Sequence, residues 1–160
     1  VAAQPEKQGP NRHGENMPQR YVVSACLAGE HCRYDGGSSP CEAVMELVRE
    51  GRAVPVCPET LGGLPTPRTP AEIREGRVIM RDGRDVSEAF ARGAAEALRR
   101  ALAEGCDAAI LKARSPSCGA GMVYDGTFTG RRVPGEGVFA RMVREAGLPV
   151  ETEETYRKSR

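Results

Sequence analysis

Short apolar runs of strand-forming residues alternate along this chain with segments that have a helical pattern. Three of the runs are Tyr21–Ala25, Arg52–Val56 and Ala108–Lys112. Between them, apolar residues recur at helical spacing over Cys41–Glu50 and Val86–Glu104. This alternation is typical of an α/β fold in which helices cover both faces of a mostly parallel sheet. We therefore expect a three-layer, Rossmann-like domain.

Further elements complete the expected domain. A last helix fits about Gly137–Ala146, and Leu148–Val150 fits a final short strand. Val78–Met80, followed by the Asp-Gly pair at 82–83, predicts a small hairpin or a strand and turn. The segment Pro58–Pro70 is rich in proline, so we expect an ordered loop or a lid there.

The domain boundaries follow from length and polarity. A chain of 160 residues fits one domain with a real core. Residues 1–19 are polar and are expected to be a disordered N-terminal extension. The domain is expected over residues 20–152. The polar residues 153–160 are expected to form a C-terminal tail that frays.

Charge and composition exclude several function classes. The formal net charge is +1 and there is no Trp, so neither bulk charge nor aromatic content favours a nucleic-acid surface. No apolar run approaches the roughly 20 residues that span a bilayer, and the start lacks the apolar segment of a signal peptide. We expect a cytoplasmic protein with no nucleic-acid or membrane partner.

Three of the six cysteines each follow one of the strand-like runs, and these are Cys26, Cys57 and Cys118. Parallel strands would bring all three thiols to the carboxyl edge of the sheet, where open α/β folds place their sites. In a reducing compartment, cysteines are more often metal ligands or reactive thiols than disulfides. Their wide spacing fits neither a zinc ribbon nor a ferredoxin motif. The pattern suggests a shared metal or iron–sulfur site, and the alternative, buried thiols that only pack in the core, stays open at this point.

The other cysteines are ambiguous. Cys32 lies in the loop after Cys26, so it fits a fourth ligand or a redox partner of Cys26. Cys41 begins a helix and Cys106 begins a strand, and both are expected to pack in the core.

The segments around these cysteines carry a set of short motifs, which are Ser24–Gly29, Cys32–Gly36, Pro55–Glu59, Leu61–Leu64, Thr66–Arg68, Gly83–Val86, Leu111–Gly119 and Tyr124–Phe128. Taken together, they resemble the small bacterial thiouracil desulfidases, formerly a domain of unknown function. The resemblance covers roughly residues 20–152.

This resemblance implies a [4Fe–4S] cluster held by Cys26, Cys57 and Cys118, with one iron not bound by the protein. It also implies that Glu59 and Ser115 act beside that iron, and that Cys32 lies nearby without binding it. The implied reaction is the non-redox desulfuration of a thiolated pyrimidine of the 2-thiouracil or 4-thiouracil type, or a related thioamide, which releases sulfide. The implied partners are this small molecule and the cluster-assembly machinery.

The residue types suit such chemistry. An open iron can act as a Lewis acid toward a thiocarbonyl sulfur. Glu59 lies two residues from a cluster thiolate, a setting that suits general acid–base work near neutrality. Alternatively, Glu59 serves only as an ion-pair partner in the proline-rich loop, and Ser115 only shapes the turn before Pro116.

Other functions remain open at this point. A first alternative is sulfur transfer to an acceptor at the same cluster. A second is a non-catalytic metal or redox-sensing module. A third is a zinc protein that uses the same thiols. Four cations are candidates to balance cluster charge or hold a substrate oxygen, although each also fits a surface ion pair: Arg33, Arg68, Lys112 and Arg114.

Overall fold

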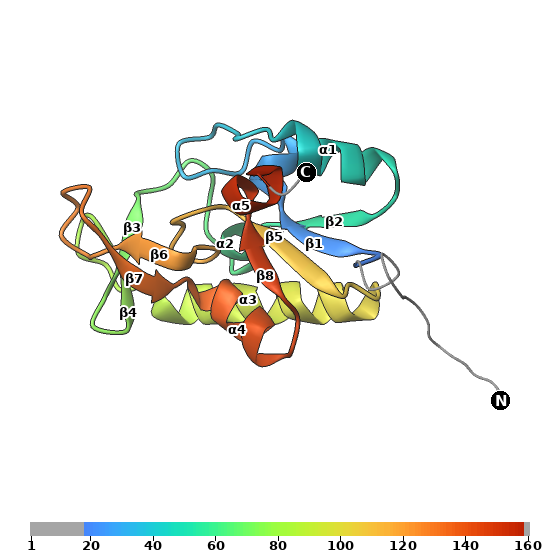
Figure 1. Cartoon of the computed structure of the whole chain (residues 1–160). Helices are drawn as coiled ribbons and strands as arrows, with labels where there is room; N and C mark the ends of the chain where they lie inside the picture. The colour runs from blue at the N-terminus through green and yellow to red at the C-terminus, as the bar shows by residue number, and fades with distance from the viewer. Residues whose placement is uncertain (1–17, 159–160) are drawn as a thin grey trace, which may run out of the picture.

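A four-stranded parallel sheet forms the centre of the computed structural model, which describes residues 18–158 (Figure 1). The strand order is β2-β1-β5-β8, and every neighbouring pair is parallel. The strands are β1 (Tyr21–Ser24), β2 (Ala53–Val56), β5 (Ala108–Leu111) and β8 (Val150–Thr152). The predicted α/β fold with a parallel sheet is confirmed.

Helices cover both faces of this sheet (Figure 1). One face packs on α3 (Ser87–Ala103) and α4 (Val138–Glu145), and the other on α1 (Glu42–Arg49) and α5 (Glu153–Lys158). Successive residues of a strand point to opposite faces, so Val22 joins the core under α3 and α4, whereas its neighbour Val23 joins the core under α1 and α5. Both faces are therefore buried, as parallel sheets require.

Smaller elements lie beyond the carboxyl edge of the sheet (Figure 1). A 3₁₀ helix, η3, follows β1, and a short helix, α2, follows β2. Two antiparallel hairpins form the rest of this end of the molecule. The bounds are η3 (Ala25–Ala28), α2 (Pro58–Leu61), β3 (Ala71–Arg74), β4 (Arg77–Met80), β6 (Ala120–Tyr124) and β7 (Arg132–Glu136).

Three features here differ from the sequence-based expectation. The proline-rich segment begins with a helical turn, α2, because Pro58 at the first helical position needs no hydrogen-bond donor. The strand and turn expected at Val78–Met80 agree with β4 and the turn after it, but β4 also pairs with an unexpected upstream strand, β3, across a turn at Glu75 and Gly76, which both have positive φ. The strand β7 was not expected, since its Pro134 and Gly135 disfavour a strand, yet they pair with Met122 and Gly121 of β6.

The segment 153–158 is also more ordered than the expected frayed tail. Residues 153–158 form α5, and Glu153 is buried. Its carboxylate accepts hydrogen bonds from the Lys112 ammonium at 3.1 Å and from the Ala113 amide at 2.8 Å. A polar residue in a nominal tail therefore fixes the turn after β5. The predicted disordered extension falls mainly on residues 1–17, which lie outside the described residues.

None of the helices in residues 18–158 is both long enough and apolar enough to cross a membrane.

Candidate functional site

A cavity of about 450 Å³ opens at the carboxyl edge of the sheet. This size falls within the range of about 300–1,000 Å³ that is usual for small-molecule sites. The five residues predicted for the site all line it, and these are Cys26, Cys57, Glu59, Ser115 and Cys118. The parallel strands β1, β2 and β5 deliver them to one edge, as the topology predicted.

Each predicted ligand occupies a defined position after its strand. Cys26 lies in η3, directly after β1, and Cys57 is the N-cap residue of α2, directly after β2. Cys118 follows the turn after β5, and its amide donates to Ser115 Oγ at 3.0 Å. The three thiols therefore enter the cavity from three separate short connections.

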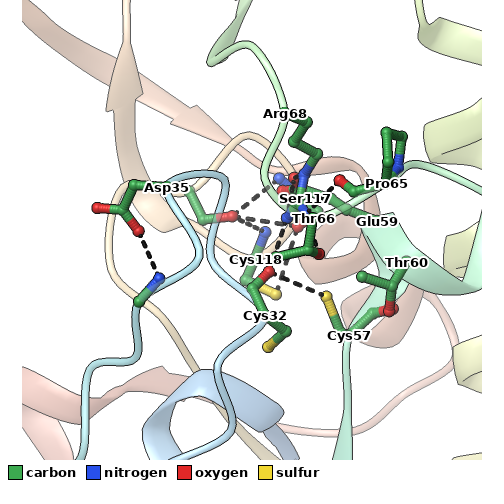
Figure 2. Close-up of polar contacts among 12 residues, drawn as sticks. Cys32, Asp35, Cys57, Glu59, Thr60, Pro65, Thr66, Arg68, Ser117 and Cys118 are labelled. Carbon is green, nitrogen blue, oxygen red and sulfur yellow. Dashed lines mark hydrogen bonds and ion pairs between the residues drawn. The ribbon is translucent and has the colours of Figure 1, made fainter.

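Cys32 joins this group of thiols. Its side chain hydrogen-bonds with those of Cys26 and Cys57, and the contact with Cys26 raises the pKa of Cys32 to about 11. The carbonyl oxygen of Cys32 lies 3.9 Å from Cys57 Sγ (Figure 2). Hydrogen bonding with Cys32, together with burial, raises the pKa of the Cys57 thiol well above its ordinary value.

Cys118 is the most enclosed of the cavity thiols. Burial raises its pKa to about 12, although hydrogen bonds with Ser24 and Ser117 oppose the shift. Thiols crowded in this way hold their protons unless a positive group reaches them. The donor set therefore fits a cationic metal group that takes up thiolates.

The two remaining cysteines lie elsewhere, in the core. Cys41 packs in the cluster between the sheet and α1, and Cys106 packs against α3 and α4. Neither of them lines the cavity. Their placement agrees with the packing roles expected from the sequence.

Glu59 is held by two partners (Figure 2). Its Oε1 accepts a hydrogen bond from Arg68 Nε at 2.9 Å, and its Oε2 accepts one from Ser117 Oγ at 3.1 Å. The Arg68 side chain is only 4% exposed, and its Nη2 also donates to the Cys32 carbonyl at 2.9 Å. Arg68 thus connects the carboxylate to the loop that carries Cys32.

Ser115 and Ser117 have different partners. The Ser115 hydroxyl oxygen accepts the amides of Ser117 and Cys118, which shapes the turn before Cys118. It also lies 3.1 Å from Ser117 Oγ. A continuous hydrogen-bonded chain therefore joins Ser115, Ser117 and Glu59.

The other candidate cations line the cavity in ion pairs. Lys112 pairs with the buried Glu153, and Arg114 pairs with Glu154 at 2.9 Å. Arg33 pairs with the exposed Asp35 at 3.1 Å. Of the four cations, Arg68 is the least exposed, and its partner Glu59 is largely buried as well.

The sequence did not indicate Ser117 or Glu153, and it did not show that Arg68 forms a buried ion pair with Glu59. Ser117 stands inside a recognised motif, next to Cys118, so proximity to a candidate ligand was an available signal. Glu153 contacts residues about 40 positions earlier. No local pattern could identify that partner.

Among residues 18–158, no three His, Cys, Asp or Glu side chains are placed so that they could hold a single metal ion. Four thiols line the cavity instead, and they belong to Cys26, Cys32, Cys57 and Cys118.

Comparisons with known proteins agree on one family. The family model described as 2-thiouracil desulfurase matches residues 21–155. The uncharacterized protein YbbK of Bacillus subtilis (strain 168) is 43% identical over 142 residues, which cover 82% of this chain and 94% of YbbK. A solved structure described as the [4Fe-4S]-dependent thiouracil desulfidase TudS is 44% identical, with a TM-score of 0.82, and the match covers 88% of this chain and 94% of that one.

Proposed function

The chain belongs to the 2-thiouracil desulfurase family and is thus a desulfidase, an enzyme that cleaves a C–S bond; we propose that its substrate is a thiolated pyrimidine of the 2-thiouracil or 4-thiouracil type. In the proposed reaction, water replaces the sulfur of the thiocarbonyl group. The products are the oxo pyrimidine and hydrogen sulfide, so atoms balance and no electrons are exchanged.

A [4Fe–4S] cluster is the proposed cofactor, held by Cys26, Cys57 and Cys118, with one iron left free of protein ligands. The solved relative is described as [4Fe-4S]-dependent, and these three thiols line one cavity here. When bound, the cluster would supply a Lewis-acidic iron that accepts the substrate sulfur and makes the attached carbon more electrophilic. Cys32 is proposed to stay beside the cluster as a free thiol.

Proton transfer is the proposed role of Glu59. Its carboxylate lines the same cavity as the thiols, and Arg68 and Ser117 fix its orientation. In the proposed reaction it takes a proton from the attacking water and returns it to the departing sulfur. A positioned acid–base group of this kind typically contributes about 10²–10⁴-fold in rate.

Ser115 is proposed to act through Ser117. Its hydroxyl accepts two backbone amides, so its own proton is directed to Ser117 Oγ, and Ser117 in turn donates to Glu59. This chain allows the charge on Glu59 to be shared with two hydroxyl groups while a proton moves.

The observation that carries the proposal is the meeting of three strand-end thiols and a tethered carboxylate in one cavity. The test is an anaerobic reconstitution followed by turnover of 2-thiouracil and 4-thiouracil. We expect loss of the thiocarbonyl absorbance and one free sulfide for each oxo product. Glu59→Gln should keep its iron and sulfide content but lose about 10²–10⁴-fold in kcat.

The same measurements separate the alternatives. If the sulfur stays on the protein or passes to an acceptor, and no free sulfide appears, the reaction is sulfur transfer and not hydrolysis. A wild-type protein with intact cluster and no turnover of any thiolated pyrimidine would favour a sensing module. Zinc in place of iron and sulfide in the anaerobically purified protein would overturn the cofactor assignment.

A further inference from the structure

Aromatic side chains gather at the cavity although the chain has few of them. It contains three Phe, four Tyr and no Trp. Three of these, Tyr34, Tyr124 and Phe128, line the cavity. Phe128 belongs to the loop between β6 and β7, which lies beyond the edge of the sheet, beside the β3–β4 hairpin (Figure 1).

The loop that carries Phe128 is fastened to β3. The Glu72 carboxylate accepts the amides of Gly126 and Phe128 at 2.9 and 3.1 Å. The Arg74 guanidinium donates twice to the Gly126 carbonyl, at 2.8 and 3.2 Å. A Cβ on Gly126 would lie 2.8 Å from the carbonyl oxygen of Ile73, so the two backbones are in close contact. The position of Phe128 is therefore imposed by several independent bonds.

The backbone of Phe128 is itself unusual. Its φ is +59°, a left-handed conformation that is unfavourable for a bulky side chain. Gly or Asn would adopt this conformation more easily. Strained residues of this kind tend to occur where a side chain is needed at a functional site. Since the aromatic ring is not required by the turn, it points to a use in the cavity.

A cation accompanies the ring. The guanidinium carbon of Arg81 lies 5.4 Å from the Phe128 ring centroid, within the range of a cation–π contact. Arg81 and Phe128 both line the cavity. Planar nucleobases stack on aromatic rings and on guanidinium groups, so this pair is suited to a flat heterocycle.

We propose that the Phe128 ring, in cation–π contact with Arg81, is the surface on which the planar ring of the substrate stacks. This stacking selects flat heterocycles over thioamides whose ring is not planar. This inference rests on the proposed function and assigns the substrate class within it. Stacking would place the ring in the cavity that contains the thiols and Glu59.

The test crosses two ligands with three variants. Uracil and 5,6-dihydrouracil carry the same carbonyl and N–H groups, but only uracil is fully planar. Phe128→Asn removes the ring and suits the left-handed backbone, Phe128→Leu keeps apolar volume, and Phe128→Tyr keeps an aromatic ring. Met122→Leu on the same hairpin, outside the cavity, is the control. Equilibrium binding is measured for each protein, together with KM and kcat for 2-thiouracil.

We expect wild type and Phe128→Tyr to bind uracil about tenfold more tightly than dihydrouracil, and the Asn and Leu variants to lose this preference. In those two variants, KM for 2-thiouracil should rise about tenfold with kcat per cluster little changed. An unchanged uracil preference, or an equal loss of affinity for both ligands, would overturn the inference. If wild type shows the uracil preference but no desulfuration, the proposed function fails while the stacking surface stands.

Discussion

The buried ion pair between Arg68 and Glu59 connects the chemistry of the site to its stability. Both side chains are largely withdrawn from solvent, and Arg68 also donates to the carbonyls of Cys32 and Pro65. Removing one member of a buried pair leaves an uncompensated charge, whereas removing both costs much less. Arg68 is therefore a positioning residue whose loss should be felt before any substrate binds.

Arg68→Met should lower the free energy of unfolding by about 3–5 kcal/mol, because Glu59 loses its partner. Adding Glu59→Gln to Arg68→Met should recover much of that loss. Denaturant unfolding of the two single variants and the double variant measures the coupling. If the losses in free energy of unfolding of the two single variants simply add in the double variant, the pair contributes little. Arg99→Met, at an exposed position, is the control for loss of a surface arginine.

Substitutions of Ser117 and Ser115 should cause different defects, one in kcat and the other in cluster content, although the two residues are only two positions apart. Ser117→Ala removes the donor to Glu59 Oε2, and a hydrogen bond to a charged group of this kind is worth roughly tenfold in kcat per cluster. The iron content should stay near that of wild type.

Ser115→Ala leaves the amides of Ser117 and Cys118 without their acceptor. We expect a lower cluster content, because the turn that presents Cys118 loses about 1–3 kcal/mol of support. Iron and sulfide analysis beside kcat per cluster separates the two effects. Equal defects in both variants would contradict the distinct positions of the two hydroxyl groups.

At the level of elements, the strands of the sheet and the position of the site at their carboxyl ends were predictable, because both depend on local sequence patterns. Apolar runs identified β1, β2 and β5, and the cysteines after them identified the edge where the site lies. The helix α2 and the strand β7 were not predictable in this way. Both contain proline, and α2 depends on close packing against α3, which no window of sequence reveals.

That packing depends on two glycines. A Cβ on Gly93 of α3 would lie 1.7 Å from the Pro58 carbonyl oxygen, and a Cβ on Gly62 would lie 2.0 Å from the Ala89 carbonyl oxygen. Because these contacts involve backbone atoms, a substitution must push α2 away from α3. The helix α2 carries Glu59, and Cys57 is its N-cap residue, so the displacement would reach the cavity.

Gly93→Ala should therefore lower the free energy of unfolding by about 1–3 kcal/mol or more, and should also lower cluster content. Helix propensity alone predicts the opposite sign, because Ala is favoured over Gly by about 1 kcal/mol inside a helix. Denaturant unfolding and iron analysis check both effects. Ala91→Ser, at an exposed position of the same helix, is the control. A stabilised, fully loaded Gly93→Ala protein would contradict the close contact.

Across the whole molecule, the residues that complete the site come from segments far apart in the chain. Ser117 meets Glu59 across 58 positions, and Glu153 meets Ala113 across 40. The sequence could indicate the thiols, because each follows a strand that has its own signal. Partners such as Arg68, Ser117 and Glu153 depend on how the connections fold back over the edge, so their pairings appear only in the structure.

The crowded thiols also make the stability of the cluster-free protein depend on pH. A thiol with its ordinary pKa of 9.0 ionises in the unfolded chain, whereas Cys118 keeps its proton in the fold until about pH 12. Above about pH 9 the folded state thus binds more protons than the unfolded state. The stability linked to this thiol is fully present below about pH 9 and is lost as the pH rises toward 12.

We therefore expect the free energy of unfolding of the cluster-free protein to fall above about pH 9, by up to about 1.4 kcal/mol per pH unit for each such thiol. Cys118→Ala should decline less steeply over the same range, whatever its stability at pH 7. Urea unfolding at a series of pH values gives the slopes, and identical slopes would contradict the burial argument.

The loaded protein should lack this contribution, because a bound thiolate has already released its proton. Cluster loading should for the same reason become more favourable as the pH rises, with protons released as the cavity thiols bind.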